Sequence, residues 1–452
     1  MERRYELRKE ELLADCQVGA EAFDGVAERL QKFAEPFLAS LPSPESKAHG
    51  HTYVSGLLSD LQRKNTEAIA YRHDVDRQVI QRFIGYAEWD HKPLLDELAR
   101  QVAAEIGEAD GVIVFDPSGF PKKGTESVGV QRQWCGRLGK TDNCQVGIYM
   151  GYVTRVEQVL VDQRLYLSKE WIADKTRRKK CGVPAETVHQ TRHEQALEML
   201  AGRGKQLPHA WVTGDDEMGR VTWFRQELQA RKEQYLLAVP GNTTVRDLEE
   251  AVPAQVVTGP GRGQRQGAKK AAFQQVHEWC AALPASAWTG LTIRDADKGP
   301  LEAEVVARRV ESKIDRRAVG FEEVLFVLRQ RTTSGDWKYD YHLSNASRET
   351  ALAEFARVAN AEHRIEQCLQ RGKSEAGLAE SQARRWEGWY HHQTLSLLAV
   401  WFLVRETRRG KKRGAGVDGA AGAGGVVADP APDLPMRHAG AYRPNADRAV
   451  AA

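Results

Sequence analysis

The sequence predicts an α/β fold with a helical N-terminal part and a β-rich insertion. Three observations support this class. Apolar residues recur at three- and four-residue spacing through the first hundred residues, as in amphipathic helices. Between residues 109 and 240, short apolar runs follow the order strand, strand, strand, helix, strand, helix, strand. Two of these runs lead directly into an acidic residue, Asp116 and Asp215.

Length and composition indicate a folded chain of several domains. With 452 residues the chain exceeds what one hydrophobic core usually organises, so two or three domains are expected. Hydrophobic residues make up 41% and charged residues 28%, which argues against global disorder. The formal net charge is only +3, so the total charge does not indicate a nucleic-acid partner. Evidence for such a partner has to come from where the basic residues cluster along the chain.

Cysteine usage and hydropathy indicate a cytoplasmic protein that does not enter a membrane. The six cysteines are scattered, without a CxxC pair or a His–Cys spacing suited to zinc, which is typical of reduced thiols inside the cell. The charged N-terminal segment lacks the apolar stretch of a signal peptide. No run approaches the roughly 20 apolar residues of a membrane span.

Residues 1–108 are expected to form a helical N-terminal domain. Leu57, Leu58 and Leu61 illustrate the apolar spacing, and basic side chains such as Arg77 and Arg82 are interleaved with it. Two interpretations stay open for these charges. They either form the solvated face of a small bundle or contact DNA.

Residues 109–240 are expected to form the first part of a catalytic core. The predicted strands and helices are 111–115, 145–154, 159–167, helix 190–201, 209–214, helix 222–231 and 235–239. Three meandering strands thus precede two parallel strands joined by helices, which matches an RNase H-like arrangement.

The rest of the chain divides into three segments. Residues 241–345 are expected to form a β-rich insertion that contains a Gly/Lys/Arg-rich loop at 259–270. Two helices, at about 347–371 and 386–404, are expected to complete the core within 346–405. Residues 406–452 are basic and then rich in Gly, Ala and Pro, which predicts a disordered tail.

Three acidic residues fall where an RNase H-like fold places metal ligands: Asp116 after the first strand, Asp215 after the fourth, and Glu366 on a later helix. Hard divalent cations prefer oxygen ligands, and two-metal phosphoryl transfer needs converging carboxylates. Each residue alone has a structural explanation, as a turn residue, a helix cap or a solvated side chain. In this fold order, however, they jointly favour metal chemistry. Asp216 and Glu217 leave the choice within the second block open.

Long motifs around these residues carry a resemblance to a known family. FDPSGFPKKGTESVGVQRQWCGRLGKTDNCQVGIYMGY (115–152) resembles the first catalytic block of bacterial insertion-sequence transposases of the 701 type. HAWVTGDDEMG (209–219) resembles their second block. HRIEQCLQRGKSEAGL (363–378) and RRWEGWYHHQTLSLLAVWFL (384–403) resemble the third. The similarity covers about residues 20–405, and the family is related to the insertion-sequence-4 group of DDE enzymes, which bear a β insertion.

The resemblance implies a DDE transposase, an endonuclease and strand transferase of DNA transposition and recombination. It implies that Asp116, Asp215 and Glu366 are catalytic and hold two Mg²⁺ ions, with Mn²⁺ as a substitute. Lys373 follows Glu366 by seven residues, as in the related group's signature, and is expected to contact a phosphate from the same helix face. The implied partners are DNA, as transposon end repeats and target, and further copies of the chain on that DNA.

Two residues depart from the family pattern. The positions expected to hold a tyrosine and an arginine are occupied by Ala359 and Glu362, and His363 or Arg364 is the substitute we expect for DNA contact. Two alternatives therefore stay open: a catalytically inactive or domesticated transposase that regulates by binding DNA, and an RNase H-like nuclease without strand transfer.

Basic residues near the first acidic residue are expected to hold the DNA backbone, namely Lys122, Lys123 and Arg132. Three basic runs, in 175–180, 262–270 and 405–413, are further candidates, although such runs are usually solvated surface. The first of them is expected in a loop. His391 and His392 lie in an aromatic-rich helix and are expected to be packed core residues.

Overall fold

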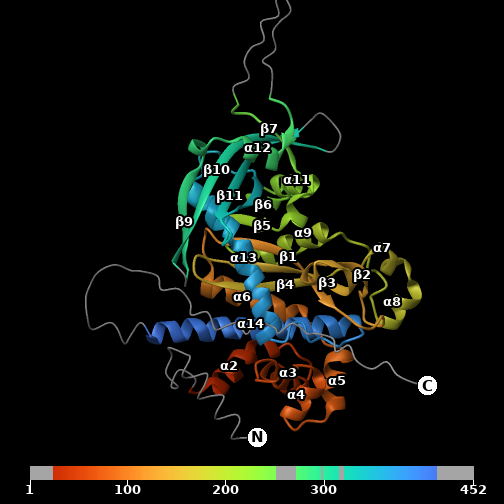
Figure 1. Ribbon diagram of the computed structural model, residues 1–452. Coiled ribbons are helices and arrows are strands. Elements are labelled where there is room, and N and C mark those ends of the chain that lie inside the picture. Colours follow the sequence, from red (N-terminus) through yellow and green to blue (C-terminus); the bar gives the residue numbers. More distant parts are fainter. Residues whose placement is uncertain (1–23, 251–270, 297–298, 315–319, 415–452) are drawn as a thin grey trace, which may run out of the picture.

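The computed structural model describes residues 24–250, 271–296, 299–314 and 320–414. Helices near the N-terminus gather at one end of the molecule, and one long mixed sheet extends away from them to the insertion at the other end (Figure 1). A long helix crosses between these two parts (Figure 1). Within the described residues, no helix combines the length and the apolar character that a membrane span requires.

The N-terminal helices form a compact group. They are α2 (Val26–Leu38), α3 (Pro44–Leu57), α4 (Thr66–Arg72), α5 (Arg77–Gly85) and α6 (Lys92–Ile106). Three of them begin at a side chain that accepts a backbone N–H, which satisfies a donor left over at a helix start; these caps are Ser43, Asn65 and Asp76. Their apolar faces pack on α14 (Trp386–Gly414), and α6 also contacts the sheet, so they share one continuous hydrophobic core with it.

The core sheet has the topology that the sequence predicts. It consists of β1 (Val112–Pro121), β3 (Lys140–Val153), β4 (Gln158–Leu165), β5 (Trp211–Gly214) and β6 (Tyr235–Val239), in the spatial order β4-β3-β1-β5-β6. The β1–β3 and β3–β4 pairs are antiparallel, whereas β1–β5 and β5–β6 are parallel. This is the RNase H-like arrangement, and the predicted fold class is confirmed.

Shorter elements connect these strands. The strand β2 (Gln131–Cys135) pairs with the start of β3. Between β4 and β5 lie α7 (Lys169–Ala173), α8 (Lys175–Cys181) and α9 (Arg192–Ala201). Between β5 and β6 lie α10 (Asp216–Gly219) and α11 (Thr222–Ala230), which return the chain to the neighbouring parallel strand.

The β-rich insertion extends the core sheet. Its elements are β7 (Thr244–Asp247), β8 (Gln274–Gln275), α12 (Val276–Ala282), β9 (Thr289–Ala296), β10 (Gly299–Lys313), β11 (Gly320–Arg331) and β12 (Trp337–Ser344). β12 pairs antiparallel with β6, which makes the sheet continuous. A buried ion pair ties the two parts together, because Arg225 of α11 donates to Glu323 of β11 over 2.9 Å. The same carboxylate accepts the Tyr235 hydroxyl of β6 at 2.6 Å.

Three details differ from the prediction. β1 does not end at Asp116 but runs to Pro121, because β3 continues to pair with it through the Pro-Ser-Gly segment. The basic run at 175–180 forms α8 and not a loop, since Asp174 caps the helix by accepting the Arg177 N–H. α14 runs to Gly414, so residues 406–414 of the predicted tail are helical. The remainder of that tail and the segment 259–270 lie outside the described residues.

Two helices cover one face of the core sheet: α13 (Leu352–Glu375) and α14. α13 approaches β3 so closely that a Cβ atom at Gly151 would overlap the Ile365 side chain. On the same face, a Cβ atom at Gly147 would lie 3.2 Å from the Trp389 ring of α14. The two glycines of β3 therefore allow both helices to pack directly on the strand.

We expect Gly151→Ala to destabilise the protein by about 1–3 kcal/mol, the usual cost of overpacking a filled core. Denaturant unfolding measures this difference. Gly136→Ala is the matched control, because no atom lies within 4 Å of a Cβ there. Adding Ile365→Val to Gly151→Ala removes the overlapping methyl group and should restore part of the loss. Equal stabilities of Gly151→Ala and Gly136→Ala would contradict the close approach of α13.

Candidate active site

Two aspartates lie on one face of the sheet at neighbouring strands. β1 and β5 are parallel and pair Val114 with Thr213, so Asp116 and Asp215, two residues further on, project to the same side. Asp116 lies opposite Tyr149 of β3. Asp215 follows the last residue of β5 and begins α10, where its carboxylate accepts the Met218 N–H at 3.0 Å. Both side chains are partly buried.

Helix α13 brings two glutamates to this face. It packs across β1, β5 and β6. Glu362 and Glu366 lie one turn apart, so they share a side of the helix. Glu362 is partly buried, whereas the Glu366 side chain is 61% exposed, with its carboxylate 3.8 Å from His363 Nδ1. One glutamate thus lies inside the site and the other at its edge.

The carboxyl groups interact strongly with one another. Burial, followed by the Asp215 charge, raises the pKa of Asp116 to about 8, and Lys373 opposes this rise. Burial raises the pKa of Asp215 to about 7, against the lowering effect of its hydrogen bond from Met218. Burial, with Asp215 and Asp116 next, raises the pKa of Glu362 well above its ordinary value. Near neutral pH the cluster therefore retains protons, since crowded carboxylates cannot all ionise.

The chemistry of this cluster fits a hard divalent cation. All of its donors are carboxylate oxygens, which Mg²⁺ and Mn²⁺ prefer, and the charge of a cation would stabilise the ionised carboxylates that burial and their neighbours disfavour. Within the described ranges, no three His, Cys, Asp or Glu side chains already stand in a metal-binding arrangement. Cation binding would therefore require the carboxylates to rotate towards one another and to lose their protons.

The other two acidic residues of the second block are paired with arginines. Asp216 accepts from Arg220 at 2.7 Å near the surface. Glu217 accepts from Arg192, whose guanidinium also lies over the Tyr166 ring. Asp215, in contrast, has no arginine partner among these contacts and accepts the Met218 N–H at the C-terminal end of β5. This favours Asp215 as the acidic residue of the second block that faces Asp116.

The predicted DNA-binding residues fall into two groups. Lys373 lies on the glutamate face of α13, with its ammonium 5.6 Å from the centre of the Phe120 ring of β1, and its charge acts on Asp116. Lys123 and Arg132 are exposed and lie on the polypeptide that follows Asp116.

Lys122 and Arg364 donate hydrogen bonds to backbone carbonyls in this structure, and their contact with DNA stays a prediction. The Lys122 ammonium donates to the Ser381 carbonyl, and burial lowers its pKa to about 8. The Arg364 guanidinium donates to Gln158 Oε1 at 2.7 Å and to the Thr154 carbonyl, so it holds the turn between β3 and β4.

Glu362 is the site residue that sequence reasoning missed. It was noted only as a departure from the family pattern, at a position expected to hold an arginine. Its four-residue spacing from Glu366 is the one signal that could have placed it on the same face. Tyr149 also belongs to the site's base: it is buried beside Asp116 and donates its hydroxyl to Gln393 at 2.7 Å. The two histidines of α14 are core residues, as expected: His391 bonds to the Ile84 and Trp89 carbonyls and His392 to Gly377.

We expect Asp116→Asn to stabilise the metal-free protein at pH 8 more than at pH 5. A carboxyl group with a folded pKa near 8, against an ordinary 3.8, makes the folded state bind more protons, so stability falls as pH rises between these values. Asparagine does not ionise and escapes this loss. Melting temperatures measured in a chelator at both pH values test the sign. The exposed Asp60→Asn is the control, and parallel pH profiles for wild type and Asp116→Asn would contradict the crowded site.

Comparison with known proteins supports the interpretation of this geometry. A family of proteins described as DDE superfamily endonuclease matches residues 36–300, more than half of the chain. A probable transposase for insertion sequence element IS701 from Microchaete diplosiphon is 32% identical over 94 residues, which span 21% of this chain and a quarter of that relative's length. The piggyBac transposase synaptic complex with hairpin DNA aligns with 86% of this chain and 74% of its own at a TM-score of 0.39 and 10% identity, too low to support an argument. The chain belongs to the DDE superfamily endonucleases.

Proposed function

We propose that this protein is a DDE transposase that cuts transposon ends and joins them to target DNA with the help of divalent metal ions. One observation carries the proposal: Asp116 and Asp215 project from neighbouring strands to one face, where α13 adds Glu362 and Glu366. Membership of the endonuclease family supports the nuclease activity. The IS701 relative, named as a probable transposase, supports the joining step.

The carboxylates have distinct roles in this proposal. Asp116 and Asp215 would bind two Mg²⁺ ions, with Mn²⁺ as a substitute, after losing the protons that their raised pKa values retain. Glu366 would complete the metal site from the solvent side, where DNA can approach. The bound cations supply Lewis-acid activation of the attacking hydroxyl and stabilisation of the leaving oxygen. Glu362, whose pKa burial and the two aspartate charges raise well above its ordinary value, would remain neutral and donate a hydrogen bond.

Basic side chains around the cluster would position the DNA. Lys373 would contact a phosphate next to the scissile bond, because it lies on the glutamate face of α13. Lys123 and Arg132 would hold the backbone on the side of β1. The exposed lysines of α8, Lys175 and Lys179, would add contacts that weaken with salt. We expect a homo-oligomer to assemble on paired ends.

The direct test is cleavage and joining of a labelled duplex that carries the element's own ends, with Mg²⁺ or Mn²⁺. We expect Asp116→Ala, Asp215→Ala and Glu366→Ala to bind DNA but to lose roughly a thousandfold or more in cleavage rate, because metal catalysis contributes several kcal/mol. A chelator should abolish cutting by the wild type. Metal-independent cutting, or full activity of the variants, would refute the proposal.

The third acidic ligand is tested by a pair of isosteric variants. Glu362→Gln should retain cleavage within a few-fold at pH 7, because glutamine resembles the protonated carboxyl that we propose there. Glu366→Gln should lose cleavage, since an amide cannot replace an ionised metal ligand. The reverse result would assign the metal to Glu362 and leave Glu366 as a surface residue.

Two other functions are distinguished by the same assay. Glu362, which stands where the family pattern expects an arginine, favours an inactive chain that regulates by binding DNA. That chain would bind ends without any metal-dependent cutting. A nuclease without strand transfer would cut but give no joined products.

A further inference from the structure

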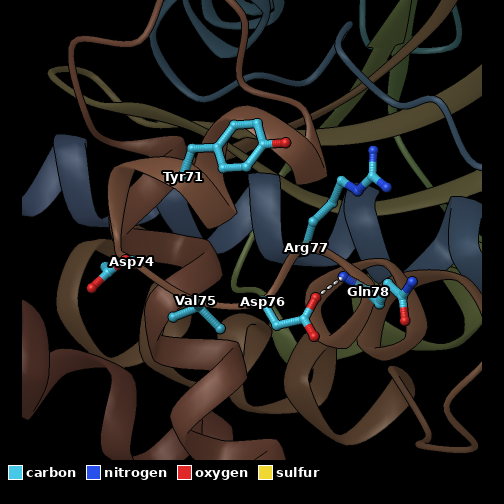
Figure 2. A pocket seen from close by; sticks show the side chains of 6 residues that line it. All are labelled: Tyr71, Asp74, Val75, Asp76, Arg77 and Gln78. Carbon is cyan, nitrogen blue, oxygen red and sulfur yellow. Dashed lines mark hydrogen bonds between the residues drawn. The ribbon is translucent and has the colours of Figure 1, made fainter.

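Helices α4 and α5 form a helix–turn–helix. α4 ends at Arg72 and α5 begins at Arg77, so four residues make the turn. Within it, Asp74 has a φ of 52°, the left-handed conformation that allows the chain to reverse sharply. Asp76 then caps α5 by accepting the Gln78 N–H at 2.7 Å, and both side chains are visible in Figure 2. Two short helices joined by a tight turn are a recurrent DNA-binding unit, in which the second helix enters the major groove.

The inner side of this unit is fixed to the rest of the protein. Ile69 and Ala70 of α4 and Ile80 and Phe83 of α5 are buried. The Ile84 carbonyl at the end of α5 accepts a hydrogen bond from His391 Nδ1 at 2.9 Å, and this bond attaches α5 to α14. α5 is therefore presented on a rigid support, as a helix that reads bases has to be.

The outer side of α5 presents arginine and glutamine. Its exposed residues include Arg77, Gln78, Gln81 and Arg82. These side chain types pair with base edges in the major groove, arginine with guanine and glutamine with adenine. α5 has no acidic residue, whereas each of the described helices α2, α3, α4 and α6 has at least one. Its charge is thus complementary to DNA along its whole exposed side.

Exposed tyrosines flank the helix. Tyr71 at the end of α4 and Tyr86 directly after α5 are 69% and 68% exposed. The Tyr71 hydroxyl donates to Glu67 Oε1 at 3.5 Å, a long surface contact that a phosphate oxygen could replace. A shallow pocket lies at the turn between the two helices, and Figure 2 shows Tyr71 and Arg77 among the residues that line it. Arg77 is held there by Glu67, whose carboxylate lies 3.0 Å from its Nη1.

We propose that α5 is a recognition helix that enters the major groove of duplex DNA and reads its sequence through Gln81 and Arg82. Tyr71 and Tyr86 then contact the backbone on either side of the groove. The basic surface of α8 differs, because it presents lysines without amide side chains and suits contact with phosphates alone. This inference deepens the proposed function, because an enzyme that cuts transposon ends has to recognise their sequence, and it rests on that function only in identifying the bound DNA as a transposon end.

The test begins with a library of duplexes that have a random centre of about 20 base pairs, selected for binding to the full-length wild type. Binding is measured by fluorescence anisotropy on the selected duplex and on a scrambled one. We expect a selected motif, and we expect Gln81→Ala and Arg82→Ala each to lower the preference for it by about tenfold or more. Arg100→Ala is the matched control, an exposed arginine of α6 that should leave the preference unchanged.

The outcomes separate this inference from the proposed function. Unchanged preference in Gln81→Ala and Arg82→Ala, with normal melting curves, would overturn the recognition helix whatever the cleavage assay shows. Equal binding of selected and scrambled duplexes by the wild type would overturn it too. Asp116→Asn should keep the preference of the wild type. If the α5 variants lose the sequence preference and the wild type never cuts DNA, the transposase proposal is refuted. The proposal that α5 is a recognition helix is then still supported.

Discussion

The close packing of α13 on β3 is the constraint on which the site depends. Only because Gly151 has no side chain can Ile365 lie directly against the strand. That contact sets the height of α13 above the sheet, and with it the positions of Glu362 inside the site and Glu366 at its edge. The carboxylates are consequently forced together by the fold. Burial is the main cause of the raised pKa values of Asp116 and Asp215, and charge repulsion adds to it, so the metal-free protein bears the cost of keeping these carboxyl groups inside the site.

The sequence predicts most of the fold and part of the site. The strands of the core were predictable because short apolar runs separated by turn residues carry their own signal, as the β-branched Val112, Ile113 and Val114 of β1 illustrate. The continuation of β1 past Asp116 was not predictable from the sequence, because Pro117 and Gly119 are residues typical of a turn. Only the pairing with β3 shows that they belong to the strand. Similarly, α8 has no apolar stripe, and the Asp174 cap together with its packing on the core stabilises it.

Side chain direction was the least predictable property of the site. Lys122 and Arg364 are basic residues beside the expected metal ligands, yet each donates to a backbone carbonyl in the interior. The partner of Lys122 is Ser381 and that of Arg364 is Thr154, both more than 200 residues away in the chain. No local sequence pattern predicts such pairs. Glu362 was overlooked for the opposite reason, because a glutamate on a charged helix is ordinarily solvated, and only tertiary packing places it beside Asp215.

α14 has a consequence for how the protein meets a long, regular ligand. It spans 29 residues, about 43 Å at 1.5 Å per residue, and packs against both the N-terminal helices and the core. Arg29 of α2 also pairs with its Glu406 at 2.6 Å. The helices proposed for recognition and the sheet proposed for the chemistry thus pack on the same continuous helix. The distance along the DNA between the recognised sequence and the cleaved phosphate would then be fixed by the dimensions of the protein.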